Sequence, residues 1–382
     1  MLNNIKPSFK IVSEELRKCY DTNGIVAGRG HYDEYWTRDA AFGCLGALLL
    51  NDTEPVERYI KYLSLTQRND GMISFLTRKY FALTQHLDKK IKAPQKPRFK
   101  SHKFFGLTDV IDSNPYFIIV LAELIKKTND KKQFEDFLEI SVKTLKWCIS
   151  KMDQTDLLST EGPIAGWNDG IYKSGKVLIT NVLFYKAFFE WENLCKKYQI
   201  KNEFPGIAKK IKLSINKTFY NGKYYSDWFD TKLHSYFDSL GNLLAVWWKI
   251  SNKDQSKKIL EYARKNLLVK PFIKPAFPAY PWYRVELFNR LAFLADYING
   301  NGYYWPEASC LYAICLSDNG YSTEAKEIIE MLSKNVIKNN GIHEVYFKNQ
   351  QPVKQWNYTA EYPYARGSAL FLLAFKKVFP NI

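Results

Sequence analysis

The chain has 382 residues and carries 55 Lys and Arg against 39 Asp and Glu, a formal net charge of +16. This charge permits an acidic partner, but the basic residues are spread over helix-like segments without a nucleic-acid-binding motif, so nucleic acid is not expected as a partner. The longest apolar run, Ala40 to Leu50, is too short to cross a bilayer, and Met1 to Tyr20 lacks the apolar core of a secretory signal. We therefore expect a cytoplasmic protein without a membrane segment.

Aromatic residues are unusually frequent, at 16% of the chain, with 10 Trp, 26 Tyr and 25 Phe. Trp and Tyr have polar tips that need partners, so this number exceeds what a core requires. Stacking platforms for sugar rings or for bases are the two obvious uses. The six cysteines show no Cys-x-x-Cys spacing and most lie in apolar helical runs, which favours small buried side chains over zinc ligands.

Amphipathic helical patterns dominate the chain, and strand-like pieces are short, at 224–226 and 343–347. Taken in order, the predicted helices are Pro7–Tyr20, Arg38–Leu50, Val56–Gln67, Pro115–Lys127, Gln133–Met152, Val177–Lys197, Ile207–Tyr220, Leu240–Ile250, Gln255–Leu268, Pro306–Leu316, Thr323–Ile337 and Arg366–Val378.

These helices fall into pairs in which an apolar helix is followed by a more charged one. Five pairs are explicit, and the last helix can pair with the first to make a sixth. The spacing between pairs varies, which argues against a regular repeat, although an irregular α-solenoid stays open. Six hairpins of unequal loop length fit a closed ring of inner and outer helices, with residues 1–382 as one domain and 87–103 as a basic loop insertion.

Loops rich in Trp or in acidic residues precede the first helix of each pair. In a ring of hairpins, all these loops open at the same end and surround one mouth, which is what a catalytic funnel requires. The loops are 35–39, 109–114, 166–170, 237–242, 303–307 and 344–366.

The third loop, Gly162 to Gly170, places one Trp beside one Asp in a turn-rich segment. Gly-rich phosphate motifs, a Gly-x-Ser-x-Gly elbow and metal-ligating His spacing are missing from the sequence. What remains is carboxylates among aromatics. Glycoside hydrolysis uses such residues. One acid lies near the glycosidic oxygen, and a second carboxylate activates water or attacks the anomeric carbon.

Several blocks of the sequence resemble, in family order, the (α/α)6-barrel glucosidases of the six-hairpin superfamily, namely the glucoamylase families and the amylo-α-1,6-glucosidase part of glycogen-debranching enzymes. The resemblance implies an all-α (α/α)6 barrel with short β pieces in its loops, and it covers most of the chain. The blocks are Tyr35-Trp36-Thr37-Arg38-Asp39, Gly166-Trp167-Asn168-Asp169 with the helix from Thr180, Phe237-Asp238-Ser239-Leu240-Gly241-Asn242, Tyr304-Trp305-Pro306 and Gly341-Ile342-His343-Glu344-Val345-Tyr346.

By position, the resemblance implies that Asp169 is the general acid and Glu344 the general base of an inverting reaction. It further implies that Arg38 and Asp39 hold hydroxyls of the terminal sugar. The substrate-binding residues implied by the matching blocks are Tyr35, Trp36, Arg38, Asp39, Trp167, Asn168, Asn181, Trp305 and Glu307. No metal or organic cofactor is needed for this chemistry.

Alternatives remain at each of these positions. Glu307 or Glu361 could replace Glu344 as the base, and Glu344 could be a surface residue. Asp169 could cap a turn, and Arg38 with Asp39 could be an ion pair at a helix start.

The preferred function is an exo-acting hydrolase that releases a glucose-like unit from an α-linked glycan or small glycoside. A hydrolase of trehalose, of a glucosylglycerate-type solute or of a charged glycan is the alternative within enzymes, given the basic loop after Leu87. The glucoamylase families use Glu as the acid where this chain has Asp169, so the resemblance favours debranching-like or trehalase-like relatives. A non-catalytic toroid that binds glycans is the alternative from another class.

Overall fold

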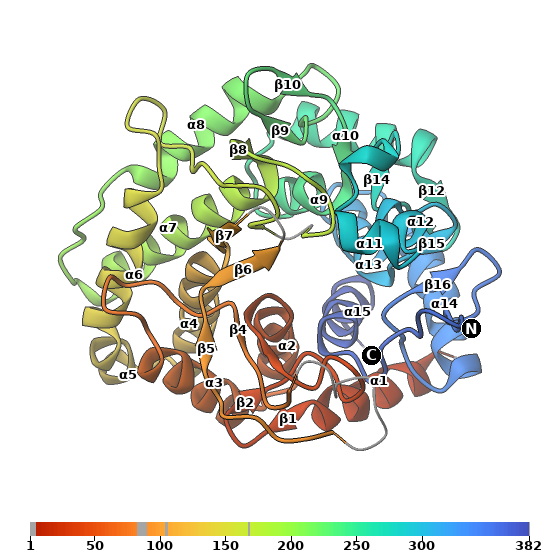
Figure 1. The fold of residues 1–382 in the computed structure, drawn as a ribbon, viewed down its shortest axis with the longest axis horizontal. Helices are drawn as coiled ribbons and strands as arrows, with labels where there is room; N and C mark the ends of the chain where they lie inside the picture. The colour runs from red at the N-terminus through yellow and green to blue at the C-terminus, as the bar shows by residue number, and fades with distance from the viewer. Residues whose placement is uncertain (1–4, 82–89, 104–105, 167–168, 382) are drawn as a thin grey trace.

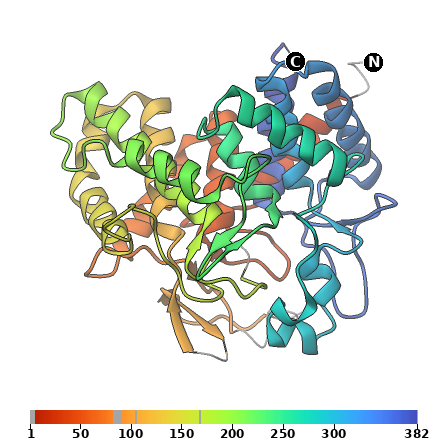
Figure 2. The ribbon, with the colours of Figure 1, turned by 90° about the horizontal axis from the view of Figure 1, so that it is seen from above.

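In the computed structural model, which describes residues 5–81, 90–103, 106–166 and 169–381, the helices form two concentric rings around a common axis. Figure 1 views the rings end-on, and Figure 2 shows them from the side. The inner ring consists of α2 (Thr37–Leu49), α4 (Ser113–Thr128), α7 (Leu178–Tyr198), α9 (Ser239–Trp247), α13 (Pro306–Asp318) and α15 (Ala365–Val378).

Each inner helix packs against the next one along the chain, and α15 closes the ring by packing on α2. The outer ring consists of α1 (Lys6–Lys18), α3 (Thr53–Leu65), α5 (Lys131–Asp136), α6 (Leu138–Ser150), α8 (Ile207–Phe219), α10 (Lys253–Asn266) and α14 (Ser322–Asn339). The expected pairing of inner with outer helices is confirmed, including that of the last helix, α15, with the first, α1.

The division into rings follows from how apolar each helix is. In α9, an inner helix, every residue from Ser239 to Val246 is buried, as expected for a helix covered on all sides. In α10, an outer helix, the buried residues are Ser256, Ile259, Leu260 and Ala263, which recur at helical spacing on one face. The opposite face of α10 carries its charged residues and meets solvent.

Short strands and small helices fill the connections between the main helices. Two three-stranded sheets are formed, one by β3 (Tyr35–Trp36), β4 (Leu76–Thr77) and β5 (Pro97–Arg98), the other by β8 (Lys176–Val177), β9 (Trp228–Phe229) and β10 (Leu233–His234). The two-stranded pairs are β1 (Tyr20–Asp21) with β2 (Gly24–Ile25), β6 (Lys100–Lys103) with β7 (Gly106–Asp109), β11 (Phe237–Asp238) with β14 (Ala276–Phe277), β12 (Leu268–Val269) with β13 (Phe272–Ile273), and β15 (Tyr303–Tyr304) with β16 (Tyr346–Phe347). The small helices are η3 (Trp282–Arg284), α11 (Leu287–Leu291) and α12 (Ala295–Asn299).

Two expectations about local structure need correction. The helix predicted over Gln133–Met152 is divided into α5 and α6 at Phe137, whose N–H donates to the carbonyl of Phe134 while its own carbonyl accepts from Ser141. The basic segment 87–103 is not all loop, because its later residues form β5 and β6, which pair with β4 and β7. Its first residues, 87–89, lie outside the described part of the chain.

Two further expectations concern the cysteines and the membrane. All six cysteines are free and buried, as predicted for small apolar side chains. Of the helices in the described ranges, none combines the length and the apolar character needed to cross a membrane.

The closure of the inner ring depends on a close approach at Gly46 of α2. A Cβ added there would lie 2.7 Å from the Cβ of Ala369 in α15 and 2.8 Å from Leu16 of α1. We expect Gly46→Val to lower the free energy of unfolding by about 1–3 kcal/mol, because an overfilled contact forces α2 and α15 apart. Denaturant unfolding measures this cost.

The matched control is Lys10→Val, which introduces the same side chain into α1 where the lysine is 82% exposed. Its cost should stay near the helix-propensity difference of about 0.5 kcal/mol. Equal effects of the two variants would contradict a tight closure at Gly46.

Candidate active site

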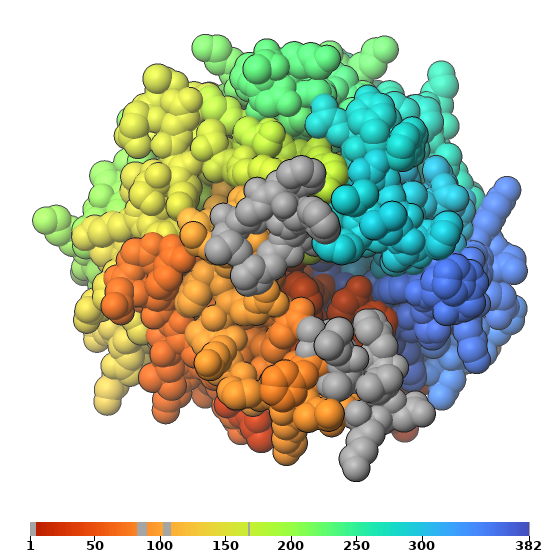
Figure 3. Space-filling model, in the orientation of Figure 1, coloured from red at the N-terminus to blue at the C-terminus, as the bar shows by residue number. Residues whose placement is uncertain are grey.

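A cavity of about 210 Å³ opens at the end of the barrel where the inner helices begin. Figure 3 shows this face of the molecule, which is hollowed between the red and orange segments and the cyan ones. Residues from five of the six expected loops line the cavity. Tyr32, Pro275, Tyr297, Ile298 and Ala308 also line it, from outside those loops. The full lining is Tyr32, Trp36, Arg38, Asp39, Asp169, Gly170, Asp238, Leu240, Pro275, Tyr297, Ile298, Trp305, Glu307, Ala308, Glu344 and Tyr364.

The start of α2 supplies the first group of lining residues. Thr37 fixes the start of the helix, since its N–H donates to Phe75 O at 2.9 Å and its hydroxyl to Ser74 O at 2.6 Å. Trp36 immediately before it lines the cavity. Because successive strand residues point to opposite faces, Tyr35 faces the other way, where its ring packs against Tyr62 at 5.2 Å.

Arg38 connects three loops at the floor of the cavity. Its Nη1 donates to Gly166 O at 2.5 Å, its Nε lies 3.6 Å from Asp112 Oδ2, and its Nη2 donates to Asp169 Oδ2 at 3.3 Å. Burial raises the pKa of Asp112 to about 6, although Arg38 opposes that shift. Asp169 is partly open to solvent, with 43% of its side chain exposed.

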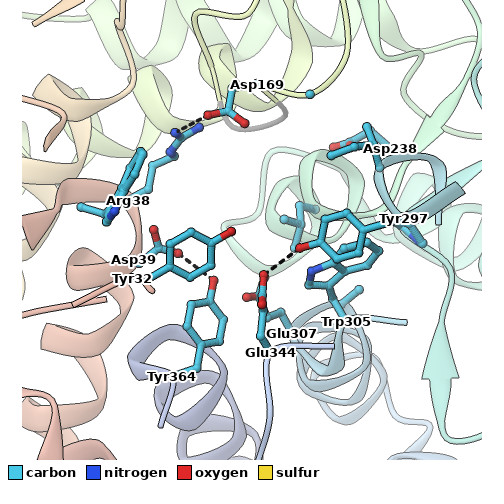
Figure 4. Close-up of a pocket in the computed structure, with 16 residues that line it drawn as sticks. Tyr32, Arg38, Asp39, Asp169, Asp238, Tyr297, Trp305, Glu307, Glu344 and Tyr364 are labelled. Carbon is cyan, nitrogen blue, oxygen red and sulfur yellow. Dashed lines mark hydrogen bonds and ion pairs between the residues drawn. The ribbon is translucent and has the colours of Figure 1, made fainter. Parts of the chain in front are cut away.

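The structure therefore places a guanidinium against the Asp169 carboxyl. Trp167 and Asn168, which the resemblance assigns to substrate binding, lie outside the described residues. Figure 4 shows Asp169 on the opposite side of the pocket from Glu344.

Glu344 is buried and held by three donors. The Tyr297 hydroxyl donates to Oε1 at 2.9 Å, the Tyr358 hydroxyl to Oε2 at 2.5 Å, and the Glu361 N–H to Oε2 at 3.1 Å. Burial raises the pKa of Glu344, while His31 and these hydrogen bonds act in the opposite direction. Glu344 is therefore not a surface residue but a carboxylate fixed in orientation at the cavity wall.

Asp39 and Glu307 share a buried arginine. Arg366 Nε lies 3.1 Å from Glu307 Oε2, and its Nη1 lies 3.9 Å from Asp39 Oδ1. The Tyr364 hydroxyl also donates to Asp39 Oδ1, at 2.7 Å. Burial raises the pKa of Glu307 to about 7, against the influence of Arg366. Arg38 and Asp39 are neighbours in the sequence but contact different groups: Arg38 contacts Gly166, Asp112 and Asp169, and Asp39 contacts Tyr364 and Arg366.

Three residues considered from the sequence do not line the cavity in the described structure: Tyr35, Asn181 and Glu361. Asn181 is fully buried, where its Oδ1 accepts from Ser159 N at 2.7 Å and its Nδ2 donates to Val177 O at 2.8 Å. Glu361 accepts from the N–H groups of Gly30 and Tyr32 and pairs with His31 at 2.9 Å. Both side chains hold backbone in place.

Sequence reasoning missed several residues that shape the site. Asp238 lines the cavity and also caps α9 by accepting from Gly241 N at 2.7 Å, and burial raises its pKa to about 6. Asp238 belongs to a block of the sequence that carries the resemblance and to the expected loop 237–242, but the sequence assigned it no role in the site. The other residues to which the sequence assigned no role are Tyr32, Asp112, Tyr297, Tyr358, Tyr364 and Arg366. Four of them, Asp112, Tyr358, Tyr364 and Arg366, lie in loops that the sequence places at the mouth, whereas Tyr32 and Tyr297 lie outside every expected loop.

The lining combines carboxylates with flat aromatic side chains. Trp36, Trp305 and Tyr297 supply ring faces, and the rings of Tyr297 and Trp305 lie 5.0 Å apart. Carboxylates that face one another across such a cavity can donate and accept protons on either side of a bound sugar. In the described ranges, no group of three His, Cys, Asp or Glu side chains is arranged to hold a metal ion.

Comparison with solved structures identifies the architecture. A GH63 mannosylglycerate hydrolase from Thermus thermophilus in complex with glucose superposes with a TM-score of 0.69 at 14% identity, over 96% of this chain and 99% of the other. The fold is an (α/α)6 barrel. A wild-type glycosidase gives a TM-score of 0.68 at 12% identity, over 99% of this chain and 98% of its own.

The barrel expected from the resemblance is therefore confirmed at the level of the fold. The sequence itself matches no protein-family model and no curated protein.

The contacts of Asn181 allow its predicted role in substrate binding to be tested. We expect Asn181→Ala to lower the free energy of unfolding by about 1–3 kcal/mol, because the buried N–H of Ser159 loses its acceptor. Ligand affinity of the folded protein should not change. Trp305→Ala is the comparison, since it removes a cavity wall and should weaken sugar binding. Thermal unfolding and calorimetric titration separate the two, and weaker binding by Asn181→Ala would restore its substrate role.

Proposed function

We propose that this barrel is an inverting, exo-acting glycoside hydrolase that releases a glucose-like unit from an α-linked glycan or small glycoside. The single observation that carries the proposal is the pair of carboxylates, Asp169 and Glu344, on opposite sides of one aromatic-lined cavity (Figure 4). The barrel fold supports it, because proteins of similar structure are glycosidases.

The size of the cavity supports exo action. Its volume of about 210 Å³ is below the roughly 300–1,000 Å³ of pockets that hold drug-sized ligands. One terminal sugar ring fits such a space better than an internal segment of a chain. The buried side chains of Arg38 and Glu307 line the cavity, and Arg366 lies behind Glu307, so we expect a glycan chain to enter by its end.

In the proposed reaction, Asp169 protonates the glycosidic oxygen and Glu344 takes a proton from the water that attacks the anomeric carbon. An inverting pair leaves room for that water, with carboxyl groups roughly 6.5–9.5 Å apart. Glu344 suits the role of base because Tyr297, Tyr358 and a backbone N–H all donate to its carboxylate. Glu361 suits the role less because it does not line the cavity, and Glu307 suits it less because the buried guanidinium of Arg366 pairs with it.

Arg38 also fits a role in substrate binding. Its side chain keeps Gly166 O and Asp112 as anchors when its contact with Asp169 is exchanged for a sugar hydroxyl. That exchange would free Asp169 to carry the proton that a general acid needs. Asp39 would accept from a second hydroxyl, with Tyr364 and Arg366 holding it in place.

A glycosylglycerate-type hydrolase is the second candidate. One structure similar to this chain, at a TM-score of 0.68 and 13% identity, is the mannosylglycerate hydrolase in complex with Tris and D-glycerate. Initial rates on glucosylglycerate and mannosylglycerate against trehalose, maltose and isomaltose distinguish the candidates. Faster hydrolysis of the charged substrates would favour the second one.

The catalytic roles are tested by exchanging each carboxyl for an amide. We expect Asp169→Asn and Glu344→Gln each to lower kcat by about 10²–10⁴-fold, the usual contribution of one acid or base. Rates on the same panel of α-glycosides provide the measurement, and proton NMR should show that the first product has the β configuration.

Asp296→Asn is the matched control, because Asp296 is exposed on α12 next to Tyr297 but does not line the cavity. It should leave kcat unchanged. Product with retained configuration would exclude the inverting mechanism. If no substrate turns over and sugars bind equally to wild type and Asp169→Asn, the protein is a glycan-binding toroid.

The acidic limb of the pH–rate profile should report Glu344. A base works when ionised, so activity falls as pH drops through its pKa. Tyr358→Phe removes a donor that stabilises the carboxylate and therefore raises the pKa of Glu344. We expect the acidic limb of kcat/KM to move to higher pH in this variant.

Tyr303→Phe serves as the control, since the Tyr303 hydroxyl donates to the exposed Gln355 at 2.8 Å. Its acidic limb should coincide with that of the wild type. Suppose that Tyr358→Phe leaves the acidic limb in place and that Glu344→Gln stays active. The general base would then be another carboxylate.

A further inference from the structure

A second and larger cavity lies at the other end of the barrel. Its volume is about 710 Å³. The inner helices begin at the catalytic cavity, and this cavity is lined by residues near their ends, among them Leu49 of α2, Lys127 of α4 and Trp247 of α9. The full lining is Leu45, Leu48, Leu49, Ile119, Glu123, Lys126, Lys127, Tyr185, Lys186, Phe189, Lys212, Trp247, Trp248, Lys249 and Leu373.

Packed side chains separate this far cavity from the catalytic one. Leu45, Ile119 and Trp248 line the far cavity and also a void of about 10 Å³ that Phe42 and Tyr116 border. The Phe42 ring centre lies 4.9 Å from the Arg366 guanidinium at the catalytic floor. A ligand of the far cavity would therefore not occupy the sugar site.

The walls of the far cavity are aromatic. The rings of Tyr185 and Phe189 stack at 5.7 Å with an angle of 25° between their planes, and those of Trp247 and Trp248 at 5.9 Å with 26°. Phe189 is 39% exposed in spite of its apolar ring. Exposed apolar surface bordered by polar groups marks binding sites on many soluble proteins.

The rim of the far cavity is positively charged. Among the described residues, its lining includes five lysines and one carboxylate, Glu123. Carboxylates pair with three of the lysines: Glu123 and Glu190 with Lys126, Glu190 with Lys186, and Asp318 with Lys249. Within the described part of the chain, no carboxylate pairs with Lys127 or Lys212. Lys212 Nζ donates to the carbonyl of Lys249 at 2.5 Å, a contact that leaves its charge without a carboxylate partner.

We propose that the far cavity is a separate, non-catalytic binding site for an amphipathic anion. The ligand would lay an apolar body of rings or alkyl chain against Tyr185, Phe189 and Trp247. Its carboxylate, phosphate or sulfonate group would meet Lys127 and Lys212 at the rim. Charge complementarity favours an anion over a neutral glycan, since the lysines outnumber the carboxylates there.

The test uses the fluorescent anion 8-anilinonaphthalene-1-sulfonate and its neutral counterpart N-phenyl-1-naphthylamine. We expect saturable binding of one sulfonate per chain, binding of the neutral counterpart at least about tenfold weaker, and weakening by added salt. The double variant Lys127→Gln, Lys212→Gln should weaken binding of the sulfonate at least about tenfold, because it removes both charge-assisted contacts. Phe189→Ser should weaken both probes.

Two controls keep the test specific. Lys10→Gln with Lys258→Gln changes the net charge equally, but on the outer helices α1 and α10, and should leave binding unchanged. Asp169→Asn should also leave it unchanged. The proposal is overturned if the double variant binds the sulfonate as the wild type does, if the neutral probe binds equally well, or if binding is lost in Asp169→Asn.

Discussion

The arrangement of the site depends on pairing buried charges at the barrel floor. Arg366 of α15 is fully buried against Glu307 of α13, and Arg38 of α2 lies against the buried Asp112 that precedes α4. Removing one partner of such a pair typically costs about 3–5 kcal/mol, because the other charge stays buried without compensation. These pairs tie the first turns of the inner helices together, and Arg38 and Arg366 also hold the cavity carboxylates Asp169, Asp39 and Glu307.

The sequence predicted the helices and their pairing because both follow from local patterns. An apolar helix followed by a charged one indicates an inner and an outer position wherever the chain must bury the first and expose the second. The order of the loops then placed seven predicted residues around one cavity. They are Trp36, Arg38, Asp39, Asp169, Trp305, Glu307 and Glu344.

Partners distant in the chain could not be predicted in the same way. The strand period indicates that Tyr35 and Trp36 point to opposite sides, but not which of them meets the cavity. Asn181 lies on an apolar helix. A polar residue in such a helix can bind a substrate or hold buried backbone, and the sequence looks the same in both cases. Tyr297 reaches Glu344 from a segment of short helices, η3 to α12, that carries no strong periodicity.

The closure of α15 on α2 has a consequence for the order in which the protein folds. While a ribosome is still producing α15, the inner ring has a gap where that helix belongs, and the face of α2 around Gly46 is uncovered. Closing the gap joins residues more than three hundred positions apart, as in the contact of Ser368 with Glu15, and such distant contacts form slowly. Arg366 and Tyr364 arrive with this last segment, so the cavity is completed only when the ring closes, and until then the apolar faces of the inner helices stay exposed to aggregation.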